Sequence, residues 1–365
     1  GGDRPSRPER PRREAGPGER PVTPRPRPDR RPAARPAPRA EVVADAMPAE
    51  VRREMKPRPP RELPAGAYPL PLSTLDWLLS RENPAARYVA FRDLLHRPPK
   101  DIERRKARQG LLRDPFLRDA LPHLRGMLPV GAPADFAAPL DAGTSFVLLL
   151  LGIGCDADVP ELQHAADLLL ARWERVFVEI ERGETPAVGS GFVAACRALL
   201  RLGYAEDDRL LGAAELLSRR RVASESVSGG VAGDLLVLSG IPEARRSALL
   251  QNAIAFSVER ATAVELPALS VDAQKTGIGV GDPSDLLEIL GALVAAGAPR
   301  TPGLDEALSR LAARADHRGR FKLERPVGVR LPVPLEREGE LSRWVTLRAL
   351  VVMQHFLGLT ITGAP

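Results

Sequence analysis

The sequence predicts an all-α fold built from helix hairpins that repeat along the last two-thirds of the chain. Two observations lead to this prediction. An apolar helical run that ends in glycine, a short polar stretch and a second amphipathic run follow one another three times. In addition, 44% of the 365 residues are apolar but only 4% are aromatic. The core must therefore consist of Leu, Ala and Val, which suits helix packing better than a sheet.

The repeated unit also determines how the helices must pack. A single hairpin cannot bury its own apolar face, so neighbouring hairpins stack and share one core. We therefore assign residues 65–365 to one helical repeat domain. The three copies of the unit are Phe146–Gly152 with Leu162–Leu170, Phe192–Gly203 with Leu210–Leu217, and Leu286–Gly297 with Leu304–Leu311.

Residues 1–64 precede this domain and are rich in Pro and Arg. Such a segment buries too little apolar surface to offset the entropy lost on ordering, so we expect a disordered tail. Residues 1–40 hold 12 Arg and 5 acidic residues, a net charge of +7, whereas the remainder of the chain carries −1. The tail is either a solvating linker or a basic segment that binds an acidic partner. The nearly neutral body argues against an extensive nucleic-acid-binding surface.

Local signals predict where the first helices begin. Ser73 opens a capping box that Asp76 completes. Asn83 is followed by proline, which places an N-cap before a favoured first helical residue. A basic helix over residues 100–112 and a shorter helix over residues 114–124 follow.

The strongest helix start in the later part of the chain lies at Asp282. Proline comes next, and Asp285 adds a second acid in the first turn, where it complements the helix dipole. Gly297 ends this helix. Ser342 is predicted to cap the last helix, which spans Arg343–Leu357.

Four passages between about residues 72 and 358 stand out together. They are DWLLSRENPAARYVAFRDLL within Thr74–Leu95, DLLEILGALVAAG at Asp285–Gly297, ADHRGRFKL at Ala315–Leu323 and SRWVTLRAL at Ser342–Leu350. In order and spacing they resemble the opening helices, a late inner helix, a Gln-x-x-Asp-Gly-x-Trp-like turn and the closing helix of one superfamily. It is the superfamily of the terpenoid cyclases and protein prenyltransferases, and the resemblance is in particular to its bacterial prenyltransferase and squalene-oxidase-repeat-like members.

The resemblance implies an α/α toroid, in which inner and outer rings of helices surround a central apolar cavity. The helix pairs by themselves suit an open HEAT-like α-solenoid equally well, so that fold stays an alternative. If the ring closes, the candidates for polar residues at the cavity are Asp282, Asp285, Trp344 and Arg348. The alternative roles are helix caps for the two aspartates, core packing for the tryptophan and an ion pair for the arginine.

Neither enzymatic branch of the superfamily has its complete motif in this chain. Squalene–hopene-type cyclases protonate an alkene with an Asp-x-Asp-Asp cluster. The nearest match, Cys155–Asp158, lacks the final acid and has the pattern of a loop. Protein prenyltransferases use zinc held by Asp, Cys and His, but the two Cys and five His here show no metal spacing. We predict no metal and no cofactor, and whether the chain is an enzyme stays open.

Two further details concern individual side chains. Phe321 stands where the family turn has Trp, and the Gln of that turn is missing. The resemblance therefore supports the fold more than it supports catalysis.

Cys155 and Cys196 lie in or beside apolar helical runs, so we expect buried, reduced thiols.

These observations lead to three alternative functions. The first is a non-catalytic toroid that binds an apolar ligand, such as an isoprenoid, or a protein partner. The second is a divergent isoprenoid cyclase or prenyltransferase-like enzyme that acts in the central cavity. The third is a scaffold whose basic tail recruits an acidic partner.

The composition also bears on location and source. The longest apolar stretch, Phe146–Cys155, is shorter than the roughly 20 residues that cross a bilayer. We therefore predict no transmembrane segment and a cytoplasmic protein. Arg outnumbers Lys 48 to 5, which is typical of a GC-rich, bacterial coding sequence.

Overall fold

The structure is a computed structural model that describes residues 62–64, 66–128, 139–184, 188–223, 230–278, 284–326, 331 and 334–363. Nearly all of the predicted Arg/Pro-rich tail, together with Asp282, lies outside the described residues. The chain divides into two units, Gly1–Lys56 and Pro57–Pro365. Every element described below belongs to the second unit.

The described part of the chain is mostly helical, as the sequence predicts. Its α-helices are α1 (Leu72–Leu78), α2 (Pro84–Val89), α3 (Ile102–Leu111), α4 (Pro115–Met127), α5 (Ala142–Gly152), α6 (Pro160–Glu181), α7 (Ser190–Leu199), α8 (Asp208–Ala223), α9 (Val231–Gly240), α10 (Ala248–Arg260), α11 (Leu286–Ala295), α12 (Pro302–Ala312) and α13 (Arg343–Leu357). The π-helical segments η1 (Ala90–Leu94), η2 (Leu200–Tyr204) and η4 (Ala261–Glu265) extend α2, α7 and α10, and η3 (Glu243–Arg245) is a 3-10 turn. The strands are β1 (Tyr68–Pro71), β2 (Phe321–Lys322), β3 (Leu341–Ser342) and β4 (Leu359–Thr362).

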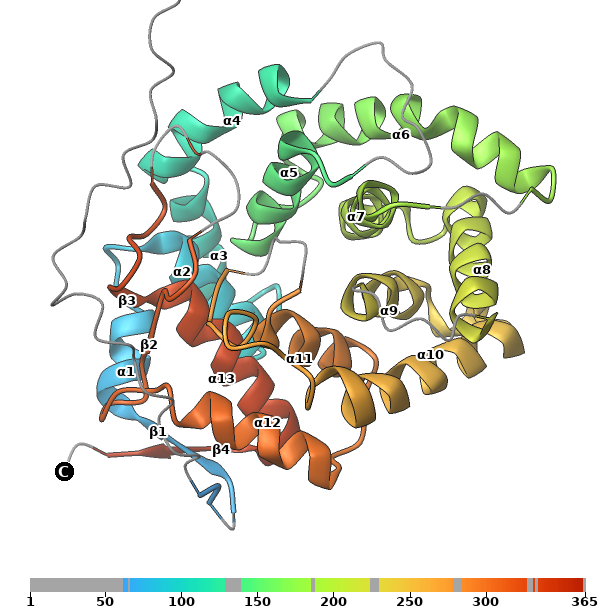
Figure 1. Cartoon of the computed structure of the whole chain (residues 1–365). Coiled ribbons are helices and arrows are strands. Elements are labelled where there is room, and N and C mark those ends of the chain that lie inside the picture. Colours follow the sequence, from blue (N-terminus) through green and yellow to red (C-terminus); the bar gives the residue numbers. More distant parts are fainter. Residues whose placement is uncertain are drawn as a thin grey trace, which may run out of the picture. The chain divides into compact units, whose positions relative to one another are not determined.

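Successive helices alternate between two rows. The inner row consists of α5, α7, α9, α11 and α13, each of which packs against the next. The outer row consists of α4, α6, α8 and α10, which also contact one another in order. Figure 1 shows α7 and α9 end-on, with α6, α8 and α10 running along the outside. At the end of the inner row, α13 packs against α2 and η1, so the last helix contacts the beginning of the domain.

Both helices of each predicted unit are present. They are α5 and α6, α7 and α8, and α11 and α12. A fourth hairpin, α9 with α10, lies between the second and third copies and is missing from the prediction. It follows the same pattern, because α9 is apolar and ends at Gly240, but Asp234 interrupts its apolar run.

Aliphatic side chains fill the core, as the low aromatic content predicts. Helix α5 is buried nearly all round, from Gly143 to Leu151, as expected for a helix with neighbours on several sides. Aromatic contacts join the first two hairpins: the rings of Trp173 and Phe192 meet edge-on with their centroids 5.3 Å apart. The rings of Phe177 and Phe192 lie 5.7 Å apart.

Two of the predicted helix caps are confirmed. The Asn83 side chain accepts a hydrogen bond from the N–H of Ala86 at 2.9 Å, and proline follows it as predicted. The Ser342 hydroxyl accepts from the N–H of Val345 at 2.9 Å at the start of α13. Both caps satisfy backbone donors that have no partner inside the helix.

The capping box predicted at Ser73 is wrong. Helix α1 already begins at Leu72, directly after β1, and no side chain caps it. Thr74, inside the same motif, donates its hydroxyl hydrogen bond to the carbonyl of Arg318. A contact with a distant part of the chain thus takes the place of the local cap.

The helix start predicted at Asp282 is also wrong. Helix α11 begins at Leu286, and its N-cap is Asp285, three residues later than predicted. Asp285 Oδ1 accepts the N–H of Glu288 at 2.8 Å. This carboxylate supplies the capping bond, so the second acid of the motif, rather than the first, sets the helix start.

Contacts between the two ends of the domain fix the position of α1 and α13. Strand β1 pairs in parallel with β4, from Tyr68 beside Leu359 to Pro71 beside Thr362. The strands β2 and β3 form a second, antiparallel pair next to the start of α13. The pair of β1 with β4 brings together segments from the two ends of the domain.

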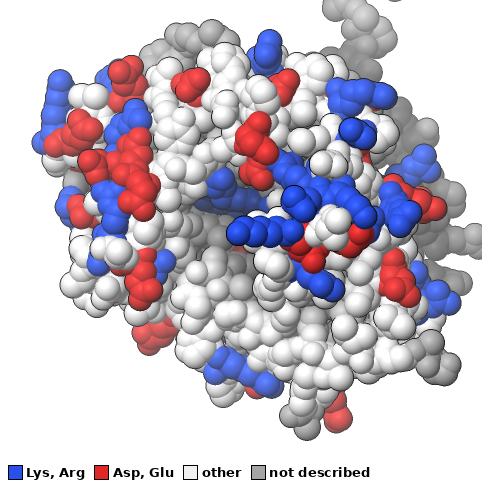
Figure 2. All heavy atoms as spheres, turned by 180° about the vertical axis from the view of Figure 1, so that it is seen from behind, with Lys and Arg blue, Asp and Glu red and all other residues white. Residues whose placement is uncertain are grey.

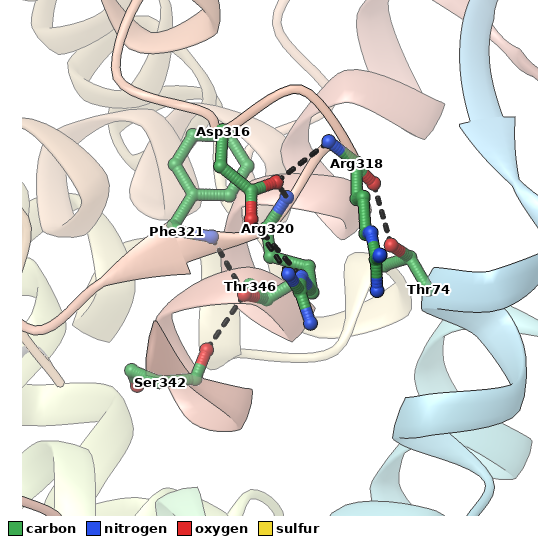
Figure 3. Close-up of polar contacts among 7 residues, drawn as sticks. All are labelled: Thr74, Asp316, Arg318, Arg320, Phe321, Ser342 and Thr346. Carbon is green, nitrogen blue, oxygen red and sulfur yellow. Dashed lines mark hydrogen bonds and ion pairs between the residues drawn. The ribbon is translucent and has the colours of Figure 1, made fainter. Parts of the chain in front are cut away.

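Asp316 organises the turn between α12 and β2 (Figure 3). Its Oδ1 accepts hydrogen bonds from the N–H groups of Arg318, at 2.8 Å, and Arg320, at 2.9 Å. Its Oδ2 forms an ion pair with the Arg320 guanidinium at 2.9 Å. Gly319 has a φ of +77°, which glycine adopts without steric cost. Because the carbonyl of Arg318 accepts from Thr74, this turn connects the C-terminal region to α1.

Phe321, which follows this turn, is fully buried. Its N–H donates to Thr346 Oγ1 at 3.0 Å, and the Thr346 hydroxyl donates to the carbonyl of Ser342 at 2.6 Å (Figure 3). The buried Phe321 ring and the hydrogen bond from its N–H to Thr346 therefore fasten the turn to α13.

We expect Asp316→Ala to destabilise the domain by about 1–3 kcal/mol, because two backbone N–H groups lose their acceptor and Arg320 loses its partner. Urea unfolding monitored by circular dichroism measures the change. Asp119→Ala removes a carboxylate from an exposed ion pair on α4 and is the matched control, with an expected change near zero.

The effect of Asp316→Ala should depend on pH in a defined direction. Burial opposes ionisation of Asp316, but hydrogen bonds from the N–H groups of Arg320 and Arg318 outweigh burial and lower its pKa. A lowered pKa gives stability that is present above the ordinary value of 3.8 and is lost as the pH falls through the folded-state pKa. The stability difference between wild type and variant should shrink on acidification. A difference that grows below pH 4 would contradict this assignment.

Candidate functional site

A pocket of about 240 Å³ lies among the inner-row helices, α2 and the π-helical segments η1 and η2. Residues from several helices that are distant in the sequence form one wall, because those helices pack side by side. The apolar part of the wall includes Val89, Leu148, Leu236, Leu287 and Val351. Pockets with a mainly apolar wall and a few polar groups are the usual form of small-molecule sites.

Charged side chains complete this wall. They come from segments that are otherwise largely apolar, so their charge is not explained by a solvent-facing helix surface. Figure 2 shows the face opposite to Figure 1, which is hollowed near its middle, with Lys or Arg side chains in and around the hollow. The charged residues at the pocket are Arg92 and Asp93 on η1, Arg197 on α7, Arg201 on η2, Glu288 on α11 and Arg348 on α13.

Two of the four arginines are paired with the two acids. Arg92 contacts Asp93 through two hydrogen bonds, at 2.5 and 2.8 Å. Arg197 Nη2 lies 2.8 Å from Glu288 Oε1. Burial raises the pKa of Glu288, whereas the positive charge of Arg197 opposes this rise.

The other two arginines donate to backbone carbonyls. Arg201 Nη2 donates to the carbonyl of Leu151 at 2.6 Å, and Arg348 Nη1 donates to the carbonyl of Gly277 at 2.9 Å. Neither guanidinium has an acidic partner among the residues that the structure describes. The charged groups that line the pocket are therefore four arginines and two acids, so its lining has an excess of positive charge.

Arg201 is exposed to solvent although protein surrounds it. Its surroundings lower its pKa to about 10, mainly through desolvation and then through the positive charges of Arg92 and Arg197. The positive charge of Arg348 also lowers the pKa of Arg201, whereas the negative charge of Asp93 raises it. An accessible cation in a positively charged environment is suited to attract an anion.

Two buried polar groups at the pocket have no hydrogen-bond partner among the residues that the structure describes. Trp344 is 3% exposed, and its indole N–H is one of them. The carboxylate oxygens of Glu288, which is 2% exposed, form no hydrogen bond with good geometry despite the ion pair to Arg197. Such groups are rare in folded proteins and mark places where a ligand or water satisfies them.

The predicted cavity residues have different outcomes. Trp344 and Arg348 line the pocket. Asp285 is buried directly behind it and caps α11, so it does not belong to the wall. Asp282 lies outside the described residues. Arg348 donates to a backbone carbonyl, whereas the alternative role considered for it was an ion pair.

The other charged residues of the pocket are missing from the prediction. A usable signal is present: Arg197 and Arg201 are four positions apart at the end of an apolar helix, so both face the same side. Glu288 is likewise the single charge within Leu286–Ala295. A charge in a helix that is apolar on every side indicates an internal polar site.

The acidic motif at Cys155–Asp158 has a structural role. Asp156 and Asp158 lie in the loop between α5 and α6, and both form ion pairs with Arg108 on α3. The guanidinium of Arg108 also lies 5.4 Å from the centre of the Tyr88 ring. The predicted loop is confirmed, and its acids connect α3 to the first hairpin.

Both cysteines are free and buried, as predicted. Burial raises the pKa of Cys155 to about 12 and also raises the pKa of Cys196. Within the described ranges, no group of three or more His, Cys, Asp or Glu side chains could hold a metal ion. No helix in those ranges is long and apolar enough to cross a membrane.

Comparison of the chain with protein-family models, with curated proteins and with solved structures finds no match. The geometry of the pocket is therefore the basis for any conclusion about function.

The ion pair between Arg197 and Glu288 can be tested by a double-mutant cycle. Arg197→Met should destabilise the domain by about 3–5 kcal/mol, because Glu288 is left buried without its partner. Arg197→Met combined with Glu288→Leu should restore most of this stability, since no buried charge remains unpaired. Denaturant unfolding gives the four free energies. A double variant as unstable as the single variant would rule out this explanation.

The acidic loop makes a separate prediction about pH. Burial raises the pKa of Asp156 to about 6, and a hydrogen bond with Asp158 adds to this effect. Asp158→Asn should lower the pKa of Asp156 toward its ordinary 3.8, which NMR titration of the carboxyl group can follow. Because a raised carboxyl pKa costs stability as the pH rises from 3.8 to about 6, this variant should lose less stability over that range. Asp119→Asn is the control and should leave the pKa of Asp156 unchanged. An unchanged Asp156 pKa in Asp158→Asn would contradict the proposed coupling.

Proposed function

We propose that the domain is an α/α toroid that binds a small molecule with an apolar part in the pocket between its inner helices, and that it acts by binding rather than by catalysis. The observation that carries this proposal is the pocket itself. It is accessible to solvent, it is enclosed by helices from several hairpins, and its wall is apolar apart from a few charged groups.

The packing order supports a closed ring over an open solenoid. In an open HEAT-like stack the first and last repeats lie far apart. Here α13 contacts α2 and η1, and β1 pairs with β4. The turn at Asp316 occupies the place that the family resemblance assigns to a helix-connecting turn, and it bonds to Thr74 on α1.

The pairing of the pocket acids supports binding over catalysis. Asp93 lies against Arg92 and Glu288 against Arg197. A carboxylate that is engaged with an arginine in this way holds that arginine in place. The acids therefore help to position the arginines of the wall.

One observation favours a second candidate function, that of a divergent isoprenoid cyclase or prenyltransferase-like enzyme. Glu288 is buried at the pocket, and burial raises its pKa, as a general acid requires. Incubation of the purified protein with polyprenyl substrates, followed by mass spectrometry, separates the two functions. Turnover that is lost in Glu288→Gln would replace the binding proposal.

Gly291 offers a direct test of the binding pocket. It lines the pocket, and a Cβ added there would meet no atom within 4 Å. Gly291→Leu should fill the space without a clash, and it should leave the domain folded and more stable by up to about 1 kcal/mol, since glycine disfavours a helix interior. Isothermal titration calorimetry with octan-1-ol, octanoate and octyl phosphate should detect binding to the wild type and none to the variant.

Gly126→Leu is the matched control. Gly126 lies on α4, outside the pocket, and a Cβ there also meets no atom within 4 Å. This variant should bind the probes as the wild type does. Equal binding by Gly291→Leu and wild type would place any ligand elsewhere and would refute the proposed pocket.

A further inference from the structure

The charge balance of the pocket indicates the kind of ligand that it accepts. Two arginines are neutralised by the two acids, as described above. Arg201 and Arg348 form no ion pair with a described residue and donate to backbone carbonyls instead. A neutral apolar ligand would leave both of these positive charges without a partner, whereas an anion would balance them.

The two guanidiniums belong to one site. Arg201 projects from η2 and Arg348 from α13, and both line the same pocket. The positive charge of Arg348 contributes to the lowered pKa of Arg201, so the two groups interact. Each guanidinium has five N–H donors in a planar fork that matches phosphate and carboxylate oxygens.

The backbone near these residues is irregular. Arg201 lies in the π-helical segment η2, and Arg92 lies in the corresponding segment η1. Segments of this kind are uncommon and occur frequently at functional sites, where they redirect side chains. Two of the pocket arginines are therefore placed by departures from the regular helix.

Trp344 supplies an independent observation. Its indole N–H is buried at the pocket and has no hydrogen-bond partner among the described residues. Leaving a buried donor unpaired is costly, and an acceptor oxygen on a ligand would remove that cost. Trp344 lies one helical turn before Arg348, so the two side chains share a face of α13.

We infer that the ligand is an amphipathic phosphate monoester, whose dianionic head group binds between Arg201 and Arg348 with the Trp344 N–H as an additional donor. This inference rests on the proposed binding function. A phosphate monoester carries a charge of about −1.5 to −2 at neutral pH, which matches the two unbalanced arginines. Its chain lies along the apolar wall near Leu287, Leu347 and Val351.

Calorimetry with probes that share one chain and differ in head group tests this inference. We expect octyl phosphate to bind the wild type at least about tenfold more tightly than octan-1-ol, with octanoate between them. Arg201→Gln and Arg348→Gln should each weaken octyl phosphate about tenfold and leave octan-1-ol unchanged. Arg348→Lys should recover part of the loss, because it keeps the charge without the fork.

Arg118→Gln is the control, since Arg118 is an exposed arginine on α4 outside the pocket. It should bind all three probes as the wild type does. Circular dichroism confirms that each variant is folded.

The outcomes separate the inference from the function on which it rests. If octan-1-ol and octyl phosphate bind equally well, and only Gly291→Leu abolishes both, the head-group inference is overturned and the binding pocket stands. The same holds if both glutamine variants bind octyl phosphate as the wild type does. If the wild type binds none of the probes, the proposed function and the inference both fail.

Discussion

Each helix pair of this domain can bury its apolar face only by sharing a core with the pairs beside it. This constraint leaves the first and last pairs with an uncovered side unless they meet. They do meet: α13 packs on α2 and η1, β4 pairs with β1, and Thr74 bonds to Arg318, which is 244 positions away in the sequence. The stability of every hairpin therefore depends in part on one junction, and the hydrogen bonds of Asp316 hold that junction in place.

The same constraint limits where charged residues of the inner row can lie. A helix such as α5, which is buried on nearly every side, leaves no solvated face for a charged residue. Burying an unpaired charge costs several kcal/mol, so Arg201 and Arg348 would be strongly unfavourable in a filled core. A water-accessible pocket lowers that cost and leaves both guanidiniums available to a ligand. The pocket and its arginines thus depend on each other.

Local patterns are sufficient for the hairpins and for the caps at Asn83 and Ser342, because these depend on residues within a few turns. They fail at Ser73, where the neighbouring Thr74 bonds to a distant carbonyl. Local patterns also cannot predict the pocket, because its charged residues come from several helices that only tertiary packing brings together. Trp344 and Arg348, which the resemblance indicated, both lie on α13 and line the pocket.

Asp285 shows that a cap and a site residue need not be alternatives. As the N-cap of α11 it fixes the first turn, from which Glu288 reaches Arg197. It also packs against Gly277, since a Cβ on that glycine would come within 2.8 Å of Asp285 Oδ2, and the Gly277 carbonyl accepts from Arg348. Asp285 therefore lies beside both the first turn of α11, which carries Glu288, and the backbone of Gly277, which binds Arg348.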